Sequence, residues 1–205
     1  MSILSYSGGT VFAMTGDECV CIGTDLRMGE QLTTVATNVK KIYKIADKVY
    51  LGLCGFNSDA HTVFNKLKLN TSLYELRENR PIKPSTVSTM IANMLYSRRF
   101  GPYYVEALVA GLDPETNQPF ISNFDCIGAP TIPQDYVAVG CGAENCVAAG
   151  EGFWQPGLKP DELFEATAQA LLSGIERDTA SGYGAVIYTI TKDKVTVKSI
   201  KTRMD

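Results

Sequence analysis

The chain has 205 residues and is 45% apolar, which supplies the core of one sizeable domain and makes two independent domains improbable. Its 19 basic and 22 acidic residues leave a formal net charge of −3, which gives no general attraction to nucleic acid or anionic membranes. The start lacks the basic and apolar regions of a secretory signal, and no stretch is long and apolar enough to span a bilayer. We therefore expect a soluble protein of the cytosol or nucleus.

Six cysteines do not predict a disulfide framework, because a chain of this size with its own core needs no covalent staples. No two cysteines have the Cys-x-x-Cys spacing of a zinc site, and His61 is the only histidine in the sequence. We therefore expect reduced cysteines that pack as small apolar residues, with no metal and no cofactor.

The first third of the chain has the composition of β-strands. Residues 10–14 and 19–25 are separated by the turn sequence Thr15-Gly16-Asp17-Glu18, which predicts a hairpin. Residues 41–45 and 49–54 make a second pair of strands, divided by a short polar turn.

The apolar spacing then changes to steps of three and four residues, which predicts two helices. The first follows Asn57-Ser58-Asp59, whose side chains can cap a helix, and the second begins at Pro84. Their apolar faces are expected at Ala60, Val63, Phe64, Leu67 and Leu69, and at Val87, Met90, Ile91, Met94 and Leu95.

The second half of the chain repeats this order of strands and paired helices. The predicted elements are strands at 103–111, 119–124 and 136–139, helices at 144–154 and 160–175, and a final hairpin at 183–191 and 194–200. Because the helices come in pairs and not after every strand, the pattern argues against a doubly wound parallel sheet. It predicts one α+β domain over residues 1–205, with two stacked antiparallel sheets between two helix layers.

Two further motifs have ordinary explanations. The sequence Val139-Gly140-Cys141-Gly142-Ala143-Glu144-Asn145 has the setting of a dinucleotide-binding loop, but Asn145 stands where the third glycine belongs. A tight turn from strand to helix is the better interpretation.

A conventional serine or cysteine triad is also disfavoured, because His61 would have to serve every candidate nucleophile and lies on the apolar-patterned helix.

The most informative pattern joins Gly9-Thr10 with Asp25, Lys41 and a turn that ends at Gly55. Sixteen positions separate Gly9 from Asp25, and sixteen separate Asp25 from Lys41. In hydrolases built around their own N-terminal threonine, the threonine hydroxyl attacks an amide and the free α-amine or a nearby lysine takes its proton. A backbone N–H of a turn glycine can bind the oxyanion. Taken alone, Asp25 and Lys41 could be a solvent-facing pair at strand ends, but the ordered combination favours such a site.

Over essentially its whole length, the sequence resembles the β-subunits of the 20S proteasome. The motifs that carry the resemblance are Ser7-Gly8-Gly9, Leu73-Tyr74-Glu75-Leu76-Arg77, Arg99-Phe100-Gly101-Pro102-Tyr103-Tyr104, Ala110-Gly111-Leu112-Asp113-Pro114, Leu163-Phe164-Glu165 and Arg203-Met204-Asp205. The resemblance implies the four-layer α-β-β-α sandwich of the N-terminal-nucleophile hydrolases. It also implies assembly into seven-membered β-rings stacked between α-rings.

The resemblance also implies which positions correspond to an active site. Active family members place the nucleophilic threonine at the position of Gly9, the acid at Asp25, the lysine at Lys41 and the oxyanion glycine at Gly55. Their second acid and their two helper serines correspond to Asp178, Ser181 and Cys141, so one helper serine is replaced. One branch of the family lacks the nucleophile and keeps its short lead uncleaved, here residues 1–8. We therefore expect these seven positions to be vestigial.

Thr10 departs from that branch, because Gly9-Thr10 imitates the bond that active subunits cut in themselves. A shift of one residue along a strand moves a nucleophile by about 3.3 Å and turns its side chain to the opposite face. We therefore expect the Thr10 hydroxyl to point away from Lys41. A misplacement of about 1 Å can already cost 100-fold in rate.

The sequence thus predicts a non-catalytic β-subunit that completes the ring and walls the chamber in which intracellular proteins are degraded. The resemblance implies type-2 and type-4 β-subunits as ring neighbours, a part in lining the type-2 substrate pocket, and a cytoplasmic and nuclear location. Two alternatives stay open, namely a self-processed threonine peptidase with Thr10 at its new N-terminus, and a separate amidohydrolase of the same fold. The sequence also leaves open whether Asp178 and Ser181 help to hold an ion.

Overall fold

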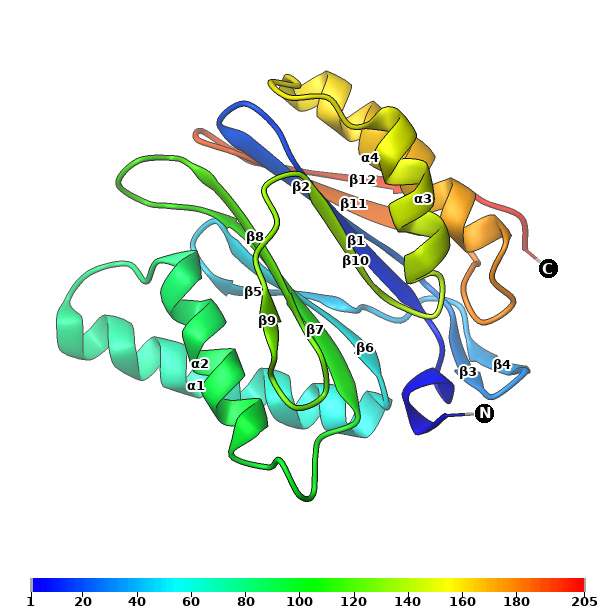
Figure 1. Ribbon diagram of the computed structural model, residues 1–205, viewed down its shortest axis with the longest axis horizontal. Coiled ribbons are helices and arrows are strands. Elements are labelled where there is room, and N and C mark those ends of the chain that lie inside the picture. Colours follow the sequence, from blue (N-terminus) through cyan, green and yellow to red (C-terminus); the bar gives the residue numbers. More distant parts are fainter. Residues whose placement is uncertain (1, 205) are drawn as a thin grey trace.

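Two five-stranded antiparallel sheets lie face to face in the computed structural model, with helices on both outer sides (Figure 1). The structure describes residues 2–204, so Met1 of the expected lead and Asp205 of the C-terminal motif lie outside the described residues. The layering confirms the α-β-β-α sandwich that the order of strands and paired helices predicts.

The first sheet has the strand order β10-β1-β2-β11-β12. These strands are β1 (Thr10–Thr15), β2 (Cys19–Asp25), β10 (Tyr136–Gly140), β11 (Ala185–Thr191) and β12 (Val195–Ile200). Every residue of β1 and β2 is buried because both faces of these strands are covered. Along β1, Phe12 and Met14 pack under the helices, whereas Val11 and Ala13 face the second sheet. This alternation decides where the side chains at the start of β1 point.

The second sheet has the strand order β5-β6-β7-β8-β9. Its strands are β5 (Ile42–Ala46), β6 (Val49–Gly55), β7 (Val105–Leu112), β8 (Pro119–Phe124) and β9 (Pro130–Thr131). Its inner face meets the first sheet in an apolar layer that includes Leu108, Ala110 and Ile121, and its outer face carries a separate cluster against two helices. The molecule therefore has three apolar layers, one between the sheets and one under each helix pair.

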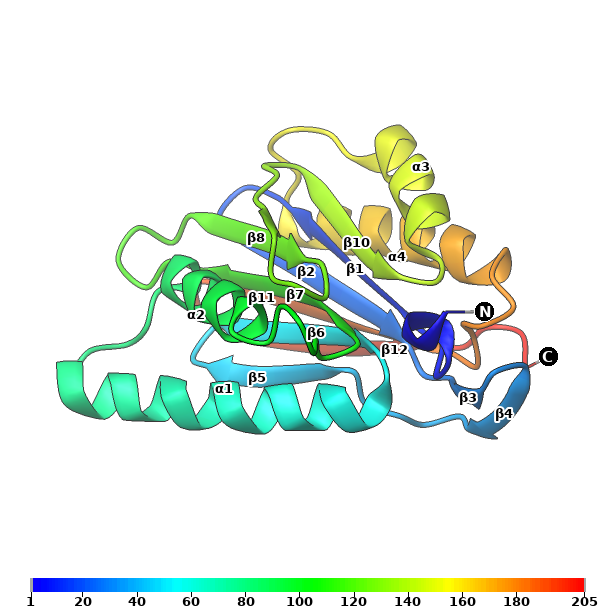
Figure 2. The same ribbon diagram turned by 60° about the horizontal axis from the view of Figure 1, so that its bottom comes forward.

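The helices flank the sheets in the expected pairs. Helices α1 (Asn57–Glu78) and α2 (Pro84–Tyr96) cover the second sheet, and α3 (Ala143–Phe153) and α4 (Pro160–Glu176) cover the first (Figures 1 and 2). A proline opens α2 and α4, where its missing N–H costs nothing. None of the helices in residues 2–204 is long and apolar enough to cross a membrane.

Two details of the predicted first helix are wrong. No side chain of Asn57-Ser58-Asp59 caps α1, because the N-cap residue is Phe56 and the Asp59 carboxylate accepts a hydrogen bond of 2.9 Å from the Tyr104 backbone N–H. Leu69, expected on the apolar face, is exposed, while Ala60, Val63 and Leu67 are buried. The buried face of α1 continues at Thr71, four residues after Leu67, whereas Leu69 follows Leu67 by only two residues and so lies off that face.

Short elements near the N-terminus have no counterpart among the predicted ones. They are a 3₁₀ turn, η1 (Ile3–Ser5), and a two-stranded hairpin of β3 (Met28–Glu30) and β4 (Thr33–Ala36). The hairpin exposes Leu32 and Val35, so no buried face produces an apolar pattern. Both chain ends lie at the end of the sandwich where this hairpin projects (Figures 1 and 2).

Helices α3 and α4 pack so closely that only glycine fits at position 174. A Cβ at Gly174 would overlap Cys146 Sγ and would lie 3.1 Å from the Cys146 backbone nitrogen. A Cβ at Gly152, on α3, would meet nothing within 4 Å. The two glycines therefore differ in their surroundings although both lie in helices of the same pair.

We expect Gly174→Ala to lower the free energy of unfolding by about 1–3 kcal/mol, because the two helices must separate. Gly152→Ala, the matched control, is expected to raise it by about 0.5–1 kcal/mol because alanine restricts the unfolded chain. Urea unfolding followed by circular dichroism measures both. A change of the same sign in the two variants would contradict the close packing of α3 against α4.

Candidate functional site

The seven predicted site positions come together at one end of the sandwich. They lie just before β1 and β5, at the ends of β2 and β6, in the turn from β10 to α3, and in the loop from α4 to β11. The predicted positions are Gly9, Asp25, Lys41, Gly55, Cys141, Asp178 and Ser181.

Asp25 is the centre of this cluster and is completely buried. Its Oδ1 atom accepts hydrogen bonds from Lys41 Nζ at 2.7 Å and from the Thr10 backbone N–H at 3.0 Å. Its Oδ2 atom accepts from the backbone N–H groups of Arg27 at 3.1 Å and Gly182 at 3.2 Å. The buried carboxylate therefore has one charged partner and three backbone donors, drawn from four separate segments of the chain.

Lys41 fills the space beside Gly9. A Cβ at Gly9 would lie 2.5 Å from Lys41 Cε and 3.0 Å from Lys41 Nζ. Gly9 also has a φ angle of +99°, in the region that favours glycine over residues with a side chain. A threonine at position 9 would therefore require both a displaced Lys41 side chain and a strained backbone.

Both hydrogen-bonding groups of the Gly9 backbone have partners within the protein. Its N–H is a peptide group and donates to the Ala180 carbonyl at 3.1 Å, and its carbonyl accepts from the Cys141 N–H at 3.0 Å. An amide nitrogen that donates a hydrogen bond cannot take a proton from a nucleophile. The position therefore lacks both the hydroxyl and the free amine that this chemistry needs.

Thr10 points to the other side of the strand, as strand alternation predicts. Its hydroxyl accepts from the Gly142 backbone N–H at 2.9 Å and lies 2.8 Å from Ser181 Oγ. The Ser181 hydroxyl donates its one hydrogen to Asp178 Oδ2 at 2.5 Å. In the contact between the two hydroxyls, Thr10 is therefore the donor and Ser181 the acceptor. The result is a directed chain from Gly142 through Thr10 and Ser181 to Asp178. Thr10 is 0% exposed, so no substrate can reach it.

The thiols near the cluster are neutral at physiological pH. Burial, followed by the negative charge of Asp178, raises the pKa of Cys141 to about 11. Burial also raises the pKa of Cys54 well above its usual range, and Lys41 opposes this shift only in part. A thiol reacts as its thiolate, so neither cysteine serves as a nucleophile here.

The space between Lys41 and Gly55 is almost filled. A cavity of about 20 Å³ remains, and Ser7 and Gly8 of the N-terminal lead help to line it together with Lys41 and Gly55. That volume admits about one water molecule. Tyr6 of the lead also packs edge to face against Phe56, the residue after Gly55, with ring centroids 6.0 Å apart. With the lead in place, the space beside Lys41 and Gly55 is too small for a peptide substrate.

Arg27 belongs to the cluster, although it was not among the predicted positions. Its buried guanidinium donates to the Ala180 carbonyl at 3.1 Å, the Gln31 carbonyl at 3.2 Å and Thr34 Oγ1 at 3.1 Å. It thereby ties the β3–β4 hairpin to the loop before β11. One sequence feature could have indicated this role. Arg27 follows Asp25 by two residues, which places both side chains on the same side of an extended chain.

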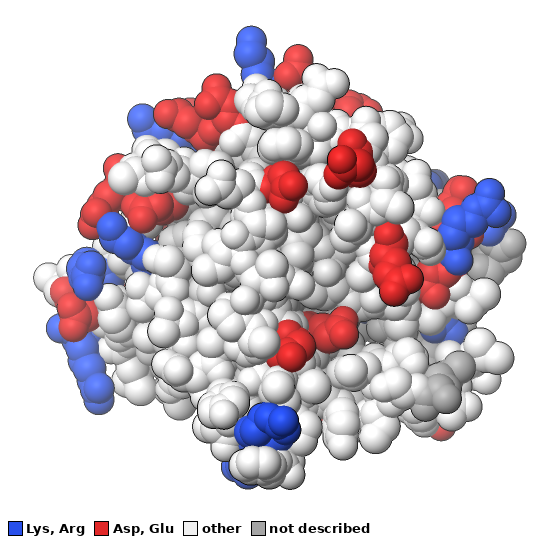
Figure 3. Space-filling view, viewed as in Figure 1, with Lys and Arg blue, Asp and Glu red and all other residues white. Residues whose placement is uncertain are grey.

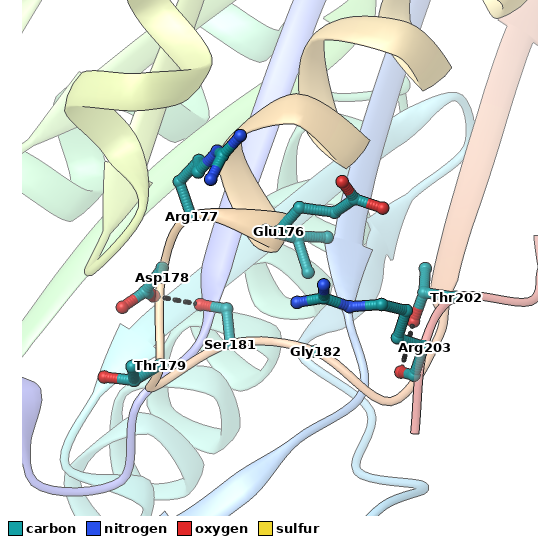
Figure 4. Close-up of a pocket in the computed structure, with 9 residues that line it drawn as sticks. Glu176, Arg177, Asp178, Thr179, Ser181, Gly182, Thr202 and Arg203 are labelled. Atoms are coloured by element: carbon teal, nitrogen blue, oxygen red, sulfur yellow. Dashed lines mark hydrogen bonds between the residues drawn. The ribbon is translucent and has the colours of Figure 1, made fainter. Parts of the chain in front are cut away.

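Asp178 and Ser181 also line a pocket of about 420 Å³, which the α4–β11 loop forms together with Thr202 and Arg203 (Figure 4). Asp178 Oδ1 accepts from the Ala180 N–H at 3.0 Å, and its Oδ2 accepts from Ser181, so both carboxylate oxygens already have partners in the chain. Within residues 2–204, no group of three or more His, Cys, Asp or Glu residues is placed to hold a metal ion.

The four-layer sandwich, with a strand start, an acid, a lysine and a turn glycine meeting at one end, defines the class of N-terminal-nucleophile hydrolase folds. The comparison with known proteins then gives the family, since the family model described as proteasome subunit matches residues 5–190. The chain belongs to the proteasome subunit family.

Three relatives align with the whole chain and over their own full length. They are proteasome subunit beta type-3 of Caenorhabditis elegans at 62% identity, of Drosophila melanogaster at 48% and of Trypanosoma brucei brucei at 44%, each over 205 residues. The similarity therefore includes the N-terminal lead as well as the sandwich.

We expect Lys41→Ala to lower the free energy of unfolding by about 3–5 kcal/mol, because it leaves the Asp25 carboxylate buried without a charged partner. Lys44→Ala is the matched control on the neighbouring strand β5. It removes an exposed pair with Asp47, in which the charged atoms are 3.2 Å apart, and should cost about 0–1 kcal/mol. Chemical denaturation of both variants measures the difference. Equal losses would show that the Asp25–Lys41 pair does not hold these segments together.

Proposed function

We propose that this chain is a non-catalytic β-subunit of the 20S proteasome. Its work is architectural, because it completes the β-ring and walls part of the chamber in which other subunits cut intracellular proteins. The full-length similarity to beta type-3 subunits supports this role. No cofactor enters into it.

The observation that carries the proposal is the state of position 9. Glycine stands there with a positive φ angle, and the Lys41 side chain fills the space that a nucleophile would need. The roles proposed for Asp25, Lys41 and Gly55 are accordingly structural. They keep the arrangement of an N-terminal-nucleophile site and brace the strand ends around it.

The alternative of a peptidase with Thr10 at its N-terminus is not favoured. The Thr10 hydroxyl donates toward Ser181 and lies on the opposite side of β1 from Lys41. Its backbone N–H donates to Asp25, which ties the peptide bond before Thr10 into the buried cluster. Removal of residues 1–9 would break the bonds of Gly9 to Ala180 and Cys141.

Type-2 and type-4 β-subunits are the proposed ring neighbours, and the cytoplasm and nucleus are the proposed location. A ring subunit uses two different flanks, so its contacts are heterologous and close by rotation. The resemblance to the type-3 branch supports both assignments, including a part in lining the substrate pocket of the type-2 subunit.

Purification of the tagged chain from its own cells tests the proposal. Intact mass and N-terminal sequencing should find the lead retained, with a start at or before Ser2, and other α- and β-subunits should co-purify in equal amounts. A chain that begins at Thr10 would establish the peptidase instead. A free, active monomer would support a separate amidohydrolase.

We expect Gly9→Thr to create no peptidase activity, because the new side chain collides with Lys41 and strains the backbone. The intact mass of the variant should retain the lead, and its unfolding free energy should fall by about 1–3 kcal/mol. Gly101→Ala is the control, because a Cβ there meets nothing within 4 Å. Loss of residues 1–8 from the Gly9→Thr variant, together with a new threonine-dependent activity, would disprove the steric argument.

A further inference from the structure

The connection between α2 and β7 exposes the most solvent-accessible large apolar side chain of the described residues. Phe100 is 98% exposed, and Tyr96, four residues earlier, is 64% exposed. We call residues 96–101 the Phe100 loop. A single exposed leucine or valine is ordinary on a protein surface, but a fully exposed phenylalanine beside a tyrosine is a feature of binding surfaces.

The Phe100 loop is held in one conformation by its own backbone. The N–H groups of Arg98, Arg99 and Gly101 donate to the carbonyls of Leu95, Tyr96 and Arg98 at 3.0–3.1 Å. On the following segment, Tyr103 accepts a 2.7 Å hydrogen bond from Lys66, and the Tyr104 backbone N–H donates to Asp59. The loop is therefore anchored on both sides. Because the loop is already ordered, binding of a partner to Phe100 would cost little conformational entropy of the loop.

The surroundings of Phe100 are basic. Arg98 and Arg99 precede it, and the Arg99 guanidinium lies 5.5 Å from the centre of the Phe100 ring. Among the described residues, no carboxylate is paired with either arginine. Figure 3 shows basic side chains at the lower edge of the molecule, where Figure 1 shows this connection. The chain as a whole is acidic, with a net charge of −3, so this basic edge runs against its overall charge.

Two hollows flank Tyr96. One, of about 370 Å³, is lined by the Phe100 loop itself, and the other, of about 330 Å³, lies between α2 and the segment 127–130. Both are open to solvent on the surface of the single chain. Side chains of a partner can therefore enter on either side of Tyr96 while Phe100 projects outward.

We propose that Phe100 inserts into an apolar socket rimmed by carboxylates on a neighbouring subunit of the proteasome. This inference rests on the proposed function. An aromatic side chain flanked by arginine is the composition that dominates binding energy at protein interfaces. The unpaired guanidinium groups require acidic partners once water is excluded. A second copy of this chain is the less suitable occupant, because the neighbours within the proposed ring are different subunits joined through heterologous contacts.

Competition for incorporation tests the inference. Tagged variant and untagged wild-type chains are expressed together, and their ratio is measured by mass spectrometry in purified proteasomes. We expect Phe100→Ala to be depleted at least tenfold, while its thermal unfolding as a free chain stays unchanged because the side chain packs against little of its own protein. The matched control is Leu32→Ala, which removes another apolar side chain, 73% exposed, on the β3–β4 turn.

The outcomes separate the two proposals. If the wild-type chain itself does not enter proteasomes, the proposed function fails, and this inference fails with it. If the wild-type chain enters and Phe100→Ala enters within twofold of it, or is depleted no more than Leu32→Ala, the proposed function stands and the socket is disproved.

The charge and the identity of the partner are tested separately. The double variant Arg98→Glu and Arg99→Glu should be depleted at least tenfold, whereas Arg98→Lys and Arg99→Lys should stay within threefold of the wild type. A photo-crosslinking phenylalanine analogue at position 100 should react with one other proteasome subunit, in a peptide that contains Asp or Glu. Crosslinks to a second copy of this chain, or to a protein outside the proteasome, would overturn the inference.

Discussion

The buried carboxylate of Asp25 is the interaction on which the rest of this end of the molecule depends. It binds a lysine from the segment before β5 and backbone groups from β1, from the segment after β2 and from the loop before β11. Burying a charge is costly, and only a full set of partners repays that cost. The carboxylate therefore fixes the relative positions of four segments, and its partners cannot be lost one at a time without penalty.

This requirement gives the acid and the lysine a structural role that does not depend on catalysis. An acid and a lysine placed as they would be beside a nucleophile are still needed as a structural joint between the two sheets. Thr10 shows the same principle. It takes part in a directed chain of hydrogen bonds that resembles a proton relay, yet it is fully buried between the turn before α3 and the loop before β11. Chemical competence depends on access and position as well as on residue type.

Much of the fold and part of the site could be predicted from the sequence. The spacing of apolar residues and the composition of the turns predicted the strands and the helix pairs. This worked because the apolar residues that set the spacing are the ones that form the buried core. The spacing of Gly9, Asp25 and Lys41 indicated the cluster, since strand alternation is regular. The packing of Lys41 against Gly9 depends on contacts between distant segments, and so does the role of Arg27, whose partners are backbone carbonyls and a threonine hydroxyl. The sequence shows only that Arg27 follows Asp25 by two residues, and it does not show which distant groups Arg27 and Lys41 contact.

Both chain ends lie at the end of the sandwich that carries the Asp25 cluster, whereas the turn between β7 and β8 lies at the opposite end (Figures 1 and 2). A fusion protein or affinity tag at either terminus would therefore crowd the same region. The β7–β8 turn, around Thr116 and Asn117, joins neighbouring antiparallel strands and lies far from that cluster. A reporter inserted there would leave both natural ends free, which suits it to following the chain inside a large assembly.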